Sequence, residues 1–181
     1  MYKDSIELLK KNNIKFEDGL TSDEVLQIEK CYNIIFPMSL RTFLMTALPV
    51  SKEFYNWRNK DKENIEKIKN MLNQPIQYIY DMPEDIYWCE DWGEEPENEE
   101  DFKFKVKKRL KKAPKLIPIY SHRYMPMFDN ENPPIISVHG ADVIYYGEDL
   151  QDFFKIEFGE KDQNTMEFEK INTIPFWTDI M

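Results

Sequence analysis

Hydrophobic positions recur with a helical period through the first half of the chain. The stretch GLTSDEVLQIEKCYNI carries Thr21 three residues ahead of Glu24. This is the spacing of a capping box, in which each side chain bonds the backbone N–H of the other residue. Apolar residues follow at helical spacing, so the pattern predicts a helix from about Ser22 to Tyr32.

A short amphipathic turn is expected at residues 6–9, before this helix, and two more helices are expected after it. Pro37 can begin a helix, because the missing N–H of proline costs little in the first turn, and Pro49 should end it. Residues 60–72 are rich in lysine and glutamate but keep one apolar stripe, which predicts an exposed helix that stops before Pro75.

From residue 116 the period changes to that of strands. LIPIY, YMPMF, IISVH and DVIYY are short apolar or alternating runs, and Gly140 suits a tight hairpin between the last two. DLQDFFKIEF then has one helical apolar face, and IPFWTDI near the end is apolar enough to dock on the body. Helices followed by strands predict an α+β protein in a single domain over residues 1–181.

Charge narrows the classes of partner. The chain has 34 acidic against 24 basic residues, a formal charge of −10. Nucleic-acid binding rests on cation-to-phosphate contacts, so we expect no nucleic-acid partner, and a negative field also disfavours anionic membranes. The same field favours encounter with a basic protein.

Two cysteines without a CxxC pair suggest neither a disulfide framework nor a zinc knuckle. The N-terminal segment lacks the apolar core of a signal peptide, and no stretch is apolar enough to span a membrane. We therefore expect a cytoplasmic protein with no membrane association.

The charges separate sharply in the middle of the chain. Eleven of the 21 residues from Asp81 to Asp101 are acidic, whereas eight of the thirteen from Lys103 to Lys115 are basic. The acidic run predicts a loop with some buried aromatic rings, and the basic run predicts a helix with one packed face. The acidic run is either a docking surface for a basic partner or a solvated loop whose charge balances that of the basic helix. The pattern favours the second interpretation.

Candidate chemistry is sparse. His122 and His139 could lie side by side on neighbouring strands as a metal pair, but a stable zinc site needs three or four ligands, so ordinary strand-end histidines are favoured and no metal is expected. The glycines form no phosphate-binding motif, and Gly-x-Ser-x-Gly is absent from the sequence. We expect no catalytic residues and no cofactor.

Two arginines lie among aromatic residues. Arg123 neighbours several tyrosines, a mixture typical of binding surfaces, although tyrosines on strands more often serve as half-buried structural residues. Arg58 ends the stretch FYNWR, which is either an aromatic recognition patch or a corner filled by Phe54 and Trp57; burial statistics favour the corner.

Three stretches together resemble the SMI1/KNR4 family, also called the SUKH superfamily. They are LTSDEVLQIEKCYNIIFPMSLRTFL, the segment LIPIYSHRYMP with its continuation NPPIISVHGADVIYYGEDLQDFFKIEF, and the terminal IPFWTDI. The resemblance covers about half of the chain in the order of the family. It implies an α+β fold whose sheet is mostly antiparallel and is packed by N-terminal helices. A charged insertion from about residue 60 to 112 departs from the compact pattern of the family.

The resemblance also implies a kind of function. Many bacterial members resemble immunity proteins that neutralise a toxin by binding it, and fungal relatives are associated with regulation of cell-wall synthesis. The leading hypothesis is therefore a non-enzymatic domain that binds a protein, for example a basic toxin domain. The alternatives are a housekeeping regulator or scaffold of the cell-wall type, and a small hydrolase, for which stoichiometric metal would be evidence. The candidate contact residues are Arg58, Trp88, Asp91, Trp92, Glu94, Glu95, Glu97 and Arg123.

Overall fold

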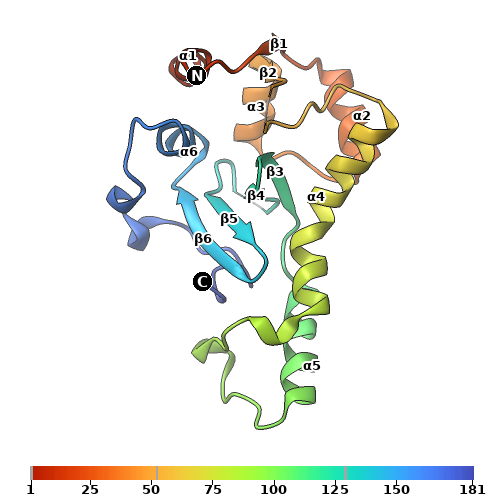
Figure 1. Cartoon of the computed structure of the whole chain (residues 1–181), viewed down its shortest axis with the longest axis vertical. Helices are drawn as coiled ribbons and strands as arrows, with labels where there is room; N and C mark the ends of the chain where they lie inside the picture. Colours follow the sequence, from red (N-terminus) through yellow and green to blue (C-terminus); the bar gives the residue numbers. More distant parts are fainter. Residues whose placement is uncertain (1, 52, 129) are drawn as a thin grey trace.

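The computed structural model describes residues 2–51, 53–128 and 130–181 (Figure 1). Across those residues the chain forms six α-helices, a two-stranded sheet and a four-stranded sheet. The helices are α1 (Lys3–Lys11), α2 (Ser22–Tyr32), α3 (Met38–Thr46), α4 (Lys62–Asp81), α5 (Glu99–Leu110) and α6 (Leu150–Glu157). The strands are β1 (Phe16–Asp18), β2 (Ala47–Pro49), β3 (Leu116–Tyr120), β4 (Arg123–Pro126), β5 (Ile135–His139) and β6 (Asp142–Gly147).

The predicted capping box is present and α2 begins directly after it. The Glu24 backbone N–H donates to Thr21 Oγ1 at 3.2 Å, and the Thr21 backbone N–H donates to Glu24 Oε2 at 2.8 Å. Both side chains thus satisfy backbone donors that the helix itself leaves open. The predicted boundaries of Ser22 and Tyr32 are confirmed.

The four-stranded sheet is an antiparallel meander in the order β3-β4-β5-β6. Gly140 adopts a φ of 65° in the tight turn between β5 and β6, a conformation that costs glycine little. The predicted α+β class, with one domain and an antiparallel sheet packed by N-terminal helices, is confirmed.

Both faces of this sheet are covered. Ile117 and Met125 are partners in register and point to one face, while Leu116 and Tyr124 point to the other. Because side chains alternate along a strand, each strand contributes to two separate hydrophobic clusters. The sheet therefore needs two layers of covering structure.

We call the two covers the N-terminal layer and the insertion layer. The N-terminal layer consists of α1, α2, α3, the first half of α4 and α6. The insertion layer consists of the second half of α4, residues 83–98, α5 and the tail of residues 174–180. Figure 1 shows α1–α3 and α5 at opposite ends of the long axis of the molecule. The charged insertion thus supplies part of the hydrophobic core.

The docked tail was predicted and is confirmed. Ile174 and Trp177 are fully buried, and the Trp177 indole N–H donates to the carbonyl oxygen of Pro114 at 2.9 Å. The tail therefore completes the hydrophobic cluster between the sheet and the insertion layer.

Two predicted helix ends were wrong. Helix α4 does not stop before Pro75 but continues through it to Asp81, because the buried stripe continues at Pro75 and Ile79. One lost backbone hydrogen bond at the proline is outweighed by this burial. Helix α3 ends at Thr46 rather than at Pro49, since residues 47–49 form β2 and pair with β1.

No α-helix in the described part of the chain has both the length and the apolar character needed to cross a membrane.

Candidate functional site

Arg58 is held inside the N-terminal layer by acceptors from β1 and α2. Its Nε donates to Glu24 Oε1 at 2.6 Å and its Nη1 donates to Glu17 Oε2 at 3.0 Å. The guanidinium also donates to Glu24 Oε2 and to the backbone carbonyls of Asp18 and Gly19. Arg58 is therefore an internal clamp on the start of α2, with its donors directed at this chain.

This clamp changes the acidity of Glu24. The Arg58 hydrogen bond and the backbone N–H of Thr21 together lower the pKa of Glu24 to about 2. The neighbouring rings Phe54 and Trp57 are 5% and 4% exposed, so the FYNWR stretch forms the packed corner that the sequence favoured.

Arg123 lies on β4 with only 12% of its side chain exposed. Its guanidinium stacks over the Tyr146 ring at 3.7 Å, and Nη1 donates to Ser137 Oγ at 3.0 Å. Its Nε lies 3.4 Å from Glu157 Oε2. Burial raises the pKa of Glu157, and the nearby guanidinium partly offsets that rise. Arg123 thus offers little free surface to a partner.

The two histidines do lie side by side. The rings of His122 and His139 are 5.9 Å apart at 71°, and Ser121 Oγ lies 3.1 Å from His122 Nδ1. Burial, Arg123 and His139 lower the pKa of His122. Within residues 2–51, 53–128 and 130–181, no group of three or more His, Cys, Asp or Glu side chains is placed to hold a metal ion.

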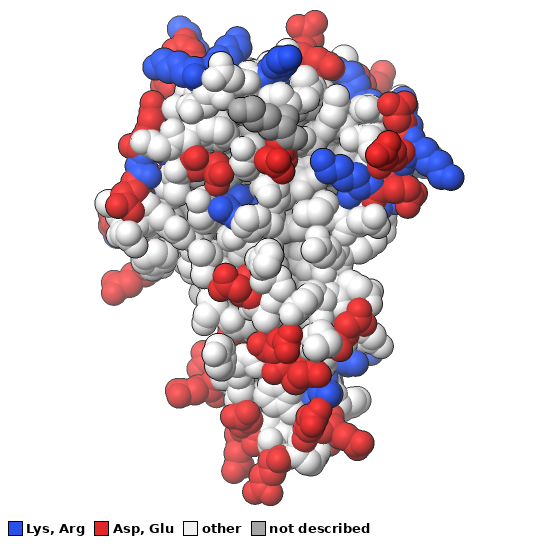
Figure 2. Space-filling view, viewed as in Figure 1, with Lys and Arg blue, Asp and Glu red and all other residues white. Residues whose placement is uncertain are grey.

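The acidic segment, residues 81–98, consists of the last residue of α4 and the loop that joins α4 to α5. Figure 2 shows acidic side chains crowded around this end of the molecule. Asp91, Glu94, Glu95 and Glu97 are all exposed. Among the described residues none of these four carboxylates forms an ion pair or a side-chain hydrogen bond. Their charge is available to a partner.

Trp88 and Trp92 attach the acidic segment to the body. Trp92 is 9% exposed, stacks on Phe176 at 5.9 Å and donates its indole N–H to Asp179 Oδ2 at 2.9 Å. Trp88 is half-buried, meets Trp92 edge to face at 5.3 Å and donates to the carbonyl of Gly93 at 2.8 Å. The two rings hold a segment that otherwise has little regular structure.

Sequence reasoning missed the exposed apolar residues beside these acids. Five large hydrophobic side chains between residues 78 and 104 are exposed, and Tyr87 is the most exposed of them at 88%. The others are Tyr78, Tyr80, Met82 and Phe104. Alternation within Ile86-Tyr87-Trp88 was the available signal, since Ile86 is buried and Trp88 half-buried.

The candidate residues therefore fall into three separate places: the Arg58 corner, the enclosed Arg123, and the acidic segment that gathers the remaining six. Compared with known proteins, the chain matches no family model, no curated protein and no solved structure. The function proposed below therefore rests on the geometry and on the resemblance described above.

Proposed function

We propose that this protein is a non-catalytic binding domain that captures a basic protein through its acidic segment. The observation that carries the proposal is the set of four exposed carboxylates Asp91, Glu94, Glu95 and Glu97, which have no ion-pair partner among the residues that the structure describes. Unpaired charge at one end of a molecule speeds the encounter with a partner of opposite sign.

Exposed aromatic surface supports the same proposal. Tyr87 and Met82 lie within the acidic segment, and Tyr80 lies just before it; Met82 is 42% exposed and Tyr80 is 48% exposed. Tyrosine is enriched among the residues that contribute most to protein interfaces, because it buries a large ring and keeps a polar tip. The acids would guide the partner and these side chains would make the close contacts.

The finer proposal is immunity: steric neutralisation of a toxin domain, as the resemblance to the SMI1/KNR4 family implies. A basic toxin domain, for example a nuclease, has the charge that the acidic segment attracts. An endogenous regulatory partner is the competing possibility. A polymorphic toxin encoded beside this protein would favour immunity, and the product of that neighbouring gene is the bait for the binding experiment.

The test compares two variants that remove four negative charges each. In the first, Asp91→Asn is combined with Glu94→Gln, Glu95→Gln and Glu97→Gln. The matched control neutralises four exposed acids elsewhere: Glu7, Asp23, Glu160 and Glu169. Association rates with the bait are measured by surface plasmon resonance over a range of ionic strength.

We expect the first variant to associate about tenfold more slowly at low salt and to lose most of its salt dependence. The control should stay within about twofold of the unmodified protein, because its charges lie outside the segment. Equal slowing in both variants would show that net charge acts without local steering. An unchanged rate in the first variant would remove the acidic segment from the interface.

A further inference from the structure

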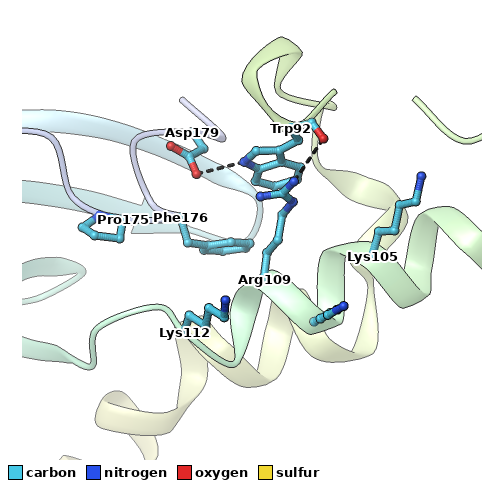
Figure 3. Close-up of a pocket in the computed structure, with 8 residues that line it drawn as sticks. Trp92, Lys105, Arg109, Lys112, Pro175, Phe176 and Asp179 are labelled. Atoms are coloured by element: carbon cyan, nitrogen blue, oxygen red, sulfur yellow. Dashed lines mark hydrogen bonds between the residues drawn. The ribbon is translucent and has the colours of Figure 1, made fainter. Parts of the chain in front are cut away.

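A groove lined mainly by cations lies beside the acidic segment, and Trp92 of that segment forms part of its wall. It has a volume of about 640 Å³ and runs between α5 and the C-terminal tail (Figure 3). Phe176 and Trp92, both largely buried, form part of its wall. The volume lies within the range of about 300–1,000 Å³ that is typical of small-molecule sites.

Four cations line this groove: Lys105, Lys108, Arg109 and Lys112. At 100° per residue they fall on one side of α5 and its immediate continuation, and they span about 10 Å along the axis. Figure 3 shows Arg109 against the Trp92 ring, with Lys105 and Lys112 on either side. The arrangement concentrates positive charge on a chain whose formal charge is −10.

Among the described residues, no carboxylate of the acidic segment forms an ion pair with these four cations. The lysine of α5 that pairs with acids is Lys103, which contacts Glu84 and Glu99. Together with Lys107 it lies on the opposite side of the helix from the groove. Lys108 and Lys112 form no ion pair with any residue that the structure describes.

One carboxylate also lines the groove. Asp179 accepts the indole N–H of Trp92 at 2.9 Å, which directs one of its oxygens to that ring. Arg109 lies 4.7 Å from the ring centre of Trp92 and donates one hydrogen bond, to the Trp92 carbonyl at 3.0 Å. A guanidinium has five N–H donors, so Arg109 keeps donors for a ligand.

We propose that this groove binds a small polyanion that carries two or more linked phosphate groups. Lysine ammonium groups are compact point charges on flexible stems. They can contact a phosphate from several directions, whereas the planar guanidinium of arginine binds in a fixed bidentate geometry. Several lysines within about 10 Å can share one di- or triphosphate. Phe176 and the exposed Pro175 add an apolar wall on which an organic ring of the ligand could rest.

Inorganic tripolyphosphate is the first probe, titrated into the full chain at low ionic strength. Binding is followed by NMR through the indole N–H signal of Trp92, which reports directly on the groove. The test variant combines Lys108→Gln with Lys112→Gln. The control combines Lys30→Gln with Lys155→Gln, two exposed lysines on α2 and α6.

We expect saturable binding that weakens about tenfold or more in the test variant and less than about twofold in the control. A nucleoside triphosphate is the second probe. Tighter binding than tripolyphosphate would mean that the ring contacts the apolar wall, and equal binding would mean that the phosphate chain alone is recognised. Either result supports the proposal.

Three results would overturn it. The Trp92 indole signal could fail to shift with either phosphate probe, or the control could lose affinity as strongly as the test variant. Tighter binding of hexaglutamate than of tripolyphosphate would assign the groove to an acidic peptide instead.

Discussion

The two layers that cover the sheet differ in whether their charged side chains are paired. In the N-terminal layer, Arg58 directs its guanidinium to Glu17, Glu24 and two backbone carbonyls. In the insertion layer, acids such as Glu94 and bases such as Lys108 are left without partners among the described residues. The difference indicates that ion pairing contributes to the stability of the first layer, and it is consistent with the proposal that the second layer binds ligands through its charges.

The largest effect is expected from the hydrophobic anchor of the insertion layer. Trp177→Ala should lower the free energy of unfolding by about 3–5 kcal/mol, because it removes a fully buried ring and leaves a cavity. Urea denaturation measures the change. Trp177→Phe should cost less, since it keeps most of the apolar volume. A loss below about 1 kcal/mol for the alanine variant would mean that the tail is not integral to the core.

A smaller effect is expected at the charged clamp of the N-terminal layer. Arg58→Met keeps much of the apolar stem but removes the N–H groups that donate hydrogen bonds to Glu24 and Glu17. It should lower the free energy of unfolding by about 1–3 kcal/mol. Lys108→Met removes a charge that has no partner in the described structure, so it should change stability by less than about 0.5 kcal/mol. Equal losses in the two variants would break the contrast between the layers.

The smallest effect is a pH dependence that belongs to Glu24. Its pKa falls from an ordinary 4.5 to about 2 in the folded protein, chiefly through Arg58. A carboxyl whose folded pKa is depressed stabilises the protein above the unfolded pKa and loses that contribution as pH falls towards the folded value.

The unmodified protein should therefore lose stability relative to Glu24→Gln between about pH 5 and pH 2. The difference between the two urea midpoints, measured across this window, isolates Glu24 from the other acids. A difference that does not vary with pH would contradict the assignment.

Local signals in the sequence were enough for much of the fold. The capping box located the start of α2, the apolar spacing followed the helix to Tyr32, and the apolar runs from residue 116 located the four strands of the sheet. The ends of α3 and α4 depended on longer-range contacts instead. Ala47 leaves α3 to pair with Asp18, and Pro75 stays within α4 because its face is buried.

Within the candidate site, the sequence predicted correctly the exposure of the charged acidic residues. The acids of the acidic segment are exposed, as such a run suggests. The arginines could not be placed, since Arg58 meets Glu24 at a separation of 34 residues and Arg123 meets Glu157 at the far end of α6. The cationic groove needs Phe176 and Asp179 beside α5, and their partner Trp92 lies 87 residues away from Asp179 in the sequence.

The position of the tail affects how the chain folds during synthesis. The four strands are complete at Gly147, yet one face of the sheet lacks Ile174 and Trp177 until about thirty more residues have left the ribosome. Tyr124, Ile136 and Val138 belong to the same hydrophobic cluster as these tail residues, so we expect them to lack part of their cover during that interval. Synthesis that stalls before residue 174 would therefore leave an aggregation-prone product rather than a shortened but working one.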